Sequence, residues 1–210
     1  MKEVRNAIPY VTLSEADIYG KGSHKKCYRM PDRGELCIKL PYNDGGVKDL
    51  SREIRYIHVM RRQHRESPLL PEYYGVVQTN YGEGHVYERI TNADGSECRT
   101  LAETLVDLKL LEEDFDGIVA LLRRMHDELL RKGIITMGLY PENILFQKTK
   151  DGRCRVRLVN DMGSKTLIPL EYFSEHFAHR RVVKRWKEFL HTIVSKYPSD
   201  MAEKLVKEIA

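Results

Sequence analysis

The sequence has few cysteines and no long apolar run, and both shortages narrow the classes of protein to which it can belong. Its four cysteines are scattered, with none in a Cys-x-x-Cys pair, which argues against a zinc site or a disulfide framework and favours a reducing compartment. No run approaches the ~18 apolar residues of a membrane span, and the first ten residues lack the apolar core of a secretory signal. We therefore expect a cytoplasmic protein without a transmembrane segment.

An excess of charge of one sign is also missing. The 35 basic and 31 acidic residues leave a net charge of +4, without a concentrated basic stripe or interleaved aromatic residues. Such a stripe is typical of nucleic-acid-binding surfaces, so we expect no nucleic-acid partner. No repeat or low-complexity segment interrupts the chain, and 210 residues suffice for one large core or two small lobes.

What the sequence does contain is a stretch from Ile134 to Lys165 that carries most of its chemistry. The apolar letters ILF, a turn with Asp-Gly and a return strand with VRLV are typical of a β-hairpin. This hairpin would place Asn143 and Asp161 at the same end. Amide and carboxylate oxygens are hard ligands that suit Mg²⁺, so the two residues form the predicted metal site.

The pair Asn143 and Asp161 resembles the catalytic-loop asparagine and the metal-binding aspartate of protein kinases. Where those enzymes have HRDLxPxN or HGDLxPxN, this chain has TMGLYPEN, ending at Asn143. The carboxylate that would accept the proton of the substrate hydroxyl falls on Gly138. The metal-binding half of the motif is kept and the general base is missing, with Glu142 as one alternative source of a base.

The N-terminal part fits the same resemblance. Gly20 and Gly22 indicate a turn between two strands whose backbone amides can approach an anion, although an ordinary hairpin turn also explains a lone Gly-x-Gly. Lys39, in the strand ELCIKL, stands where kinases have the lysine that pairs with the phosphates. The alternative is a simple charge on a strand edge.

Two further positions complete the predicted nucleotide site. Glu53 lies beside the apolar face of a helix predicted over 47–63 and would orient Lys39 toward the α- and β-phosphates. Otherwise it offsets a neighbouring arginine on a solvated surface. By the same resemblance, the backbone near Glu88 and Ile90 would hold the adenine ring.

The order of these elements predicts an α+β, protein-kinase-like fold with two lobes. Residues 1–90 would form a five-stranded antiparallel small lobe, residues 91–99 a linker, and residues 100–210 a reduced, mainly helical large lobe. A capping box at Thr100, a long helix ending before Gly133 and a last helix capped by a serine near the C-terminus support the helical half. Because only 47 residues follow the Asn-Asp-Met-Gly motif, and IPLE resembles the kinase Ala-Pro-Glu only weakly, we do not expect peptide substrates.

The segments GKGSHKKCY, LCIKL, REIRYI, TMGLYPENIL and NDMGSKTLIPL are together very similar to the YrbL family of bacterial proteins, named for membership of the PhoP regulatory network. The similarity includes the unusual features, namely Thr-Met in place of His-Arg and a residue other than an acid before the leucine of the loop. Membership implies a kinase-like fold and a setting in a bacterial envelope or low-magnesium stress response.

The sequence supports two hypotheses about function, and both include ATP and Mg²⁺ as cofactors. The first is an atypical, low-activity phosphotransferase that acts on a small molecule or an envelope component. The second is a pseudokinase, a regulatory binding module whose nucleotide shapes a surface for a partner protein without catalysis. A third hypothesis, a structural protein that binds no nucleotide, is the weakest, because five elements of the nucleotide site would then be present without a function.

Overall fold

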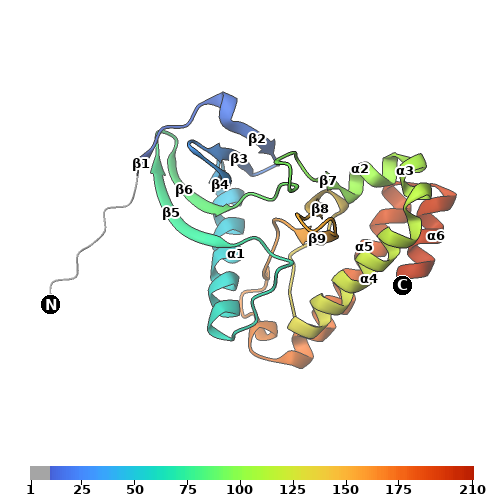
Figure 1. Cartoon of the computed structure of the whole chain (residues 1–210). Coiled ribbons are helices and arrows are strands. Elements are labelled where there is room, and N and C mark those ends of the chain that lie inside the picture. The colour runs from blue at the N-terminus through green and yellow to red at the C-terminus, as the bar shows by residue number, and fades with distance from the viewer. Residues whose placement is uncertain (1–9) are drawn as a thin grey trace. The chain divides into compact units, whose positions relative to one another are not determined.

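The computed structural model describes residues 10–210, which divide into two compact units (Figure 1). Unit 1 contains the described residues up to Ser51 together with Pro71–Arg89, and unit 2 contains Arg52–Leu70 together with Ile90–Ala210. The first nine residues, where we expect no apolar targeting segment, lie outside the described residues. The boundaries predicted for the two lobes and their linker stay predictions.

Unit 1 is built on a six-stranded sheet. Its strands lie in the order β1 (Tyr10–Val11), β5 (Tyr73–Thr79), β6 (Gly82–Glu88), β4 (Arg33–Pro41), β3 (Lys25–Met30) and β2 (Ile18–Lys21). Neighbours pair antiparallel except for β1, which runs parallel to β5. The prediction of five antiparallel strands is therefore wrong by one strand. A strand of only two residues is too short to give an alternating pattern in the sequence.

The centre of this sheet is strand β4. Five successive residues, Leu36 to Leu40, are buried, so side chains on both faces of the strand are covered, while β3 and β6 pair with its two edges. Ile38 is fully buried, and a Cβ on Gly84 of β6 would lie 2.5 Å from its Cγ2 atom, so glycine permits the close approach of the two strands. A one-turn 3₁₀ helix η1 (Glu15–Asp17) precedes β2, and helix α1 (Asp44–Arg62) follows β4.

Unit 2 contains most of the helices and a small sheet. The helices are α2 (Leu101–Val106), α3 (Leu108–Glu113), α4 (Phe115–Lys132), α5 (Glu175–Lys196) and α6 (Asp200–Ile209), with 3₁₀ turns η2 (Pro141–Asn143) and η3 (Leu170–Tyr172). The sheet has the order β7 (Arg99–Thr100), β8 (Ile144–Lys148) and β9 (Cys154–Leu158). Among residues 10–210, no helix is both long enough and apolar enough to cross a bilayer.

Local signals in the sequence explain where these helices begin and end. Thr100 Oγ1 accepts from the Glu103 amide at 3.1 Å, and the Glu103 carboxylate accepts from the Thr100 amide at 2.7 Å, which confirms the predicted capping box. Helix α4 ends at Gly133, in the left-handed region with φ +56°. Ser199 Oγ accepts from the Ala202 amide at 3.1 Å and so caps α6.

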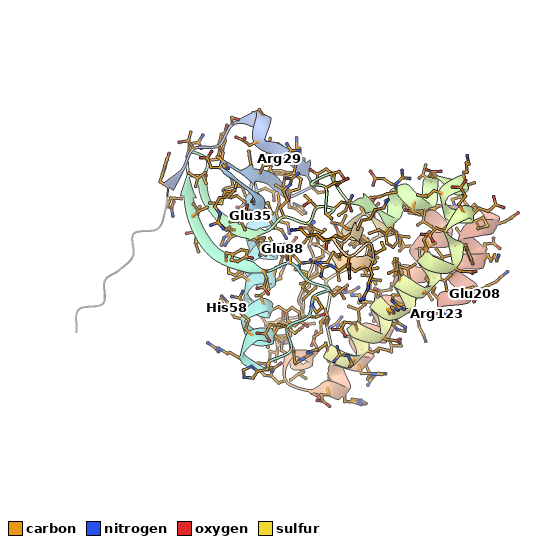
Figure 2. All side chains as sticks on the ribbon, viewed as in Figure 1. Arg29, Glu35, His58, Glu88, Arg123 and Glu208 are labelled. Carbon is orange, nitrogen blue, oxygen red and sulfur yellow. The ribbon has the colours of Figure 1, made fainter. Side chains whose placement is uncertain are left out.

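Helices α4, α5 and α6 pack against one another around the larger core (Figure 1). Trp186 of α5 is 3% exposed, and its ring stacks on the His126 imidazole of α4 with centroids 4.1 Å apart. Its indole Nε1 donates to the carbonyl of Ile209 at 3.0 Å. Figure 2 labels Arg123 and Glu208, whose side chains form an ion pair of 2.9 Å between α4 and the end of α6. These contacts make the three helices one packed body.

Candidate functional site

Backbone hydrogen bonds hold the loop before β8 against the segment after β9. The amide of Met137 donates to the carbonyl of Asp161 at 2.6 Å, and the amide of Val159 donates to the carbonyl of Asn143 at 2.9 Å. The β8–β9 hairpin begins directly beside these bonds, with Ile144 paired to Leu158, which confirms the predicted hairpin. Both segments are thereby fixed at the mouth of the hairpin.

Three side chains at this mouth form a chain of hydrogen bonds. Asn143 Nδ2 donates to Asp161 Oδ2 at 2.9 Å, and Asn160 Nδ2 donates to Asn143 Oδ1 at 3.3 Å. Because an ionised carboxylate only accepts, Asp161 sets the orientation of the Asn143 amide, which in turn sets that of Asn160. Asn160 Oδ1 is left buried, without a hydrogen-bond partner among the described residues. A buried acceptor of this kind indicates a place where a ligand or ion would complete the bonding.

The backbone here adopts a conformation that few residues tolerate. Asn160 has φ +64° and Asp161 has φ +57°, both in the left-handed region. Asparagine and aspartate accept this region better than other side chains, and such strain gathers at ligand sites. Gly163 has φ +98°, and a Cβ there would lie 3.1 Å from the Arg52 carbonyl oxygen and from Tyr56 Cβ, so only glycine fits. The backbone conformation therefore explains the asparagine, the aspartate and the glycine of the Asn-Asp-Met-Gly motif.

The donor set at the hairpin mouth suits a magnesium ion that arrives with a phosphate. Its oxygens come from the Asp161 carboxylate and the Asn143 amide, and Mg²⁺ commonly takes one or two protein oxygens together with waters and phosphate oxygens. Residues 10–210 contain no cluster of three or more histidine, cysteine, aspartate or glutamate side chains that could hold a metal alone. The residues thus fit a metal–phosphate complex better than a bare metal ion.

Gly138, at the predicted base position, is filled by the side chain of Tyr140. A Cβ on Gly138 would lie 2.4 Å from Tyr140 Cε2 and 2.6 Å from its hydroxyl oxygen, closer than real Cβ atoms come. Gly138 is not among the residues with positive φ, so the tyrosine ring, rather than the backbone conformation, explains the glycine. The sequence gives no sign of this role of Tyr140, because the direction of its ring depends on the folded loop.

Glu142, considered as a replacement base, is already engaged. Its carboxylate forms an ion pair with Lys196, and Oε1 accepts from the Tyr197 hydroxyl at 3.1 Å. Burial raises the pKa of Glu142, but the hydrogen bonds from Lys196 and Tyr197 outweigh burial and hold this pKa below its ordinary value. A carboxylate with a lowered pKa, one of whose oxygens already accepts from two donors, is a weak proton acceptor. Glu142 is therefore a poor substitute for the missing aspartate.

The segment after Gly163 is anchored by a buried ion pair. Glu171 is 5% exposed and accepts from Arg181 Nη2 at 3.0 Å and from Ser164 Oγ at 2.5 Å. Burial raises the pKa of this carboxyl, but the bonds from Ser164 and Arg181 outweigh it and lower the pKa. Tyr172, 3% exposed, accepts from the Ser164 amide at 2.9 Å. The glutamate of the weak Ala-Pro-Glu-like segment is thus a structural anchor.

The two predicted charges of the nucleotide site are buried, each in its own unit. Lys39 on β4 is 4% exposed and its Nζ lies 4.2 Å from the centroid of the Tyr87 ring. Since β4 lies inside the sheet, the alternative of a charge on a strand edge is wrong. Glu53 on α1 is 0% exposed, so the alternative of a solvated surface charge is also wrong. Their pairing stays a prediction.

The predicted glycine turn is the β2–β3 hairpin. The Gly22 amide donates to the Lys25 carbonyl at 2.9 Å. A Cβ on Gly20 would lie 3.6 Å from Cys27 Cβ, and one on Gly22 would lie 3.8 Å from the Lys25 oxygen, which are ordinary contacts. The turn itself therefore does not require glycine at either position, and a close approach by a ligand would.

The predicted adenine-binding stretch is partly occupied by sheet hydrogen bonds. The Glu88 amide donates to the Glu72 carbonyl at 2.8 Å, and the Arg89 amide donates to the Glu35 carbonyl at 2.8 Å. Ile90, 6% exposed, begins the second part of unit 2. A base would have to be held by carbonyl groups of this stretch or by the backbone from Ile90 onward.

A family model and two curated relatives all match this chain as members of one family. The family model described as "PhoP regulatory network protein YrbL" matches residues 11–194. The protein named "Uncharacterized protein YrbL" from Escherichia coli (strain K12) is 34% identical over 182 residues, which cover 86% of each chain, and the protein of the same name from Shigella flexneri gives the same values. The matched range includes every candidate residue from Gly20 to Asp161. The chain belongs to the YrbL family.

Proposed function

We propose that this protein binds ATP together with Mg²⁺ in a kinase-like site. The observation that carries the proposal is the chain of hydrogen bonds through Asn143, Asp161 and Asn160, with its buried unpartnered oxygen. In this proposal Asp161 and Asn143 hold the metal, which offsets the charge of the phosphates. The resemblance to kinases assigns Lys39 to the α- and β-phosphates and Glu53 to the orientation of Lys39.

The three side chains can rearrange to present oxygens. Asn143 now turns Nδ2 toward Asp161 and Oδ1 toward Asn160. A half-turn of its amide would place Oδ1 beside the Asp161 carboxylate, ready for a cation, and Nδ2 toward Asn160. A matching half-turn of Asn160 would let its Oδ1 accept that N–H. The Asn160 oxygen would then have a partner, and its Nδ2, moved to the place that Oδ1 now occupies, would face an acceptor such as a phosphate oxygen.

Two observations favour a regulatory nucleotide-binding module over an efficient phosphotransferase. The Tyr140 ring fills the space of a side chain at Gly138, and Glu142 is engaged by Lys196 and Tyr197. A positioned base typically contributes about 10²–10⁴-fold to a rate, so its loss slows transfer without abolishing it. A low-activity phosphotransferase on a non-peptide acceptor is the second candidate, because phosphoryl transfer depends mainly on positioning and charge.

Thermal unfolding with ATP, with Mg²⁺ and with both tests the proposal. We expect stabilisation only when both are present, by about 2.7 kcal/mol when the free ligand is at about 100 times its Kd. Asp161→Asn should remove the dependence on Mg²⁺ and leave the fold intact, whereas Asp127→Asn, on the exposed side of α4, serves as the control. An unchanged melting temperature at saturating Mg²⁺–ATP would show that the nucleotide site is wrong. Radiolabelled ATP then separates the two candidates by whether a product forms.

Replacing Lys39 tests the cationic part of the site. Lys39→Met keeps an apolar side chain against Tyr87 and removes the charge, so the sheet should stay folded. We expect the affinity for Mg²⁺–ATP to fall by about 1.5–3 kcal/mol, the range for a hydrogen bond to a charged group. Lys48→Met, at an exposed position of α1 in unit 1, is the matched control for calorimetric titration. Equal affinities in the two variants would remove Lys39 from the site.

A further inference from the structure

The segment from Lys165 to Phe177 in unit 2 gathers exposed apolar side chains. Of the fourteen exposed large apolar side chains among residues 10–210, five lie here. Leu167 is 95% exposed, Phe173 76% and Ile168 73%, and the other two are Leu170 and Phe177. Exposed apolar side chains gathered in one short segment are typical of a surface that another molecule covers.

These side chains are held outward by anchors at both ends of the loop. Ser164, at the start, donates its amide to the Tyr172 hydroxyl and its own hydroxyl to Glu171. Glu171 and Tyr172, at the end, are both buried, and Arg181 of α5 holds the glutamate. The loop between the anchors therefore presents Leu167 and Ile168 as part of its folded form.

Positive charge continues from this loop along α5. The range from Lys165 to Lys187 contains six lysines or arginines and two glutamates, so its net charge equals the +4 of the whole chain. Glu171 is buried in its ion pair with Arg181, so these two charges offset each other. Arg180, Lys184 and Lys187 line one shallow hollow, as their helical spacing requires. Glu188 lies at the end of the same hollow and pairs with Lys184 at 3.9 Å, so the cations outnumber the acid there by three to one. We call Lys165–Lys187 the basic-apolar surface.

We propose that the basic-apolar surface docks on an anionic lipid bilayer. The apolar side chains of the loop would enter the headgroup region, and the cations of α5 would face the lipid phosphates. Leu167 stands almost free of its own protein, so a protein partner would need a matching pocket, whereas a bilayer interface receives any protruding apolar side chain. A second copy of this chain is disfavoured as the partner, because a symmetric contact would bring the α5 cations of the two copies together.

Cosedimentation of the full chain with vesicles, without nucleotide, tests this proposal independently of the proposed function. We expect binding to vesicles of phosphatidylglycerol mixed with phosphatidylcholine and none to phosphatidylcholine alone. Binding should weaken with salt, because the screening length falls from about 10 Å at about 0.1 M to about 3 Å at about 1 M. Arg180→Glu with Lys184→Glu should abolish the preference for the anionic lipid.

The apolar part is tested by Leu167→Ser with Ile168→Ser, which are exposed and so leave the core unchanged. The affinity should fall about tenfold or more, since each large apolar side chain gains that much on leaving water. Val106→Ser with Leu108→Ser, exposed elsewhere in unit 2, is the control and should bind like the wild type. Wild-type protein that ignores anionic vesicles, or a serine variant that binds them equally well, overturns the proposal. Tighter capture by duplex DNA or an acidic polypeptide, unaffected by the serine substitutions, would do so too.

Discussion

The two ends of the loop from Gly138 to Asn143 differ in what surrounds them. At Asn143, polar side chains hydrogen-bond to one another and leave one buried oxygen of Asn160 without a partner. At Gly138, the ring of Tyr140 takes the space that a side chain would need. The position where protein kinases have an aspartate is therefore covered by an exposed ring, whereas the other end of the loop is a hydrogen-bonded polar cluster.

The largest expected effect on stability comes from Gly138→Ala, which forces the Tyr140 ring out of its place. We expect a loss of about 1 kcal/mol in the free energy of unfolding, at the low end for overpacking, because the Tyr140 ring is 44% exposed and can turn toward solvent. Denaturation in urea measures it, and Gly34→Ala, where nothing lies within 4 Å of the new Cβ, is the control. Adding Tyr140→Ala should relieve part of the loss. If Gly138→Ala proves as neutral as the control, the ring does not occupy this space in solution.

The next effect concerns the polar end, where Asn160 can be changed without straining its left-handed backbone. Glycine and aspartate both tolerate φ +64°, so Asn160→Gly and Asn160→Asp should fold. Removing a residue that orients a metal ligand typically costs about 10–100-fold in metal affinity, and we expect this for Asn160→Gly. Asn160→Asp should retain the affinity, because its carboxylate can accept from the turned Asn143 amide.

Binding of Mn²⁺ in the presence of ATP, followed by electron paramagnetic resonance, measures this difference directly. The two Asn160 variants form a matched pair, since both tolerate the left-handed backbone and only aspartate supplies an acceptor. Equal affinities for wild type, Asn160→Gly and Asn160→Asp would show that Asn160 does not orient Asn143.

The smallest effect is expected for Glu142→Gln, between the two ends of the loop. Glu142 is 44% exposed in its side chain, and exposed ion pairs contribute about 0.2–1 kcal/mol. Because the pKa of Glu142 is lowered in the folded state, its contribution is present above the unfolded value of about 4.3 and is lost as the pH falls through the folded value. Unfolding curves of wild type and variant should therefore differ slightly at pH 7 and converge in acid. If Glu142→Gln also lowers ATP turnover, Glu142 takes part in the reaction.

Local patterns made part of this structure predictable. The Asp-Gly turn fixes the β8–β9 hairpin, and the Thr100 capping box and Gly133 mark helix ends, because each depends on residues close in sequence. The proximity of Asn143 and Asp161 followed from the hairpin, since its two strands must return to the same end.

Other features depend on residues far apart and were not predictable. Asn160 contacts Asn143 across 17 positions, and a half-buried asparagine gives no periodic signal. The sequence left open whether Lys39 lies on an edge strand, because only the strand order shows that β4 pairs with a neighbour along each of its edges. Strand β1 forms by parallel pairing with β5, and its two residues are too few to give a strand pattern in the sequence.

The stacked pair Trp186 and His126 gives the protein an optical reporter of its own. Trp186 is the single tryptophan of the chain, and it lies in unit 2 with its ring against the imidazole. Its fluorescence therefore reports on the packing of α4, α5 and α6, and unit 1 contributes no tryptophan signal. The unfolding of unit 2 can be followed by emission alone, while circular dichroism records both units. Any gap between the two curves would measure how far the units unfold together.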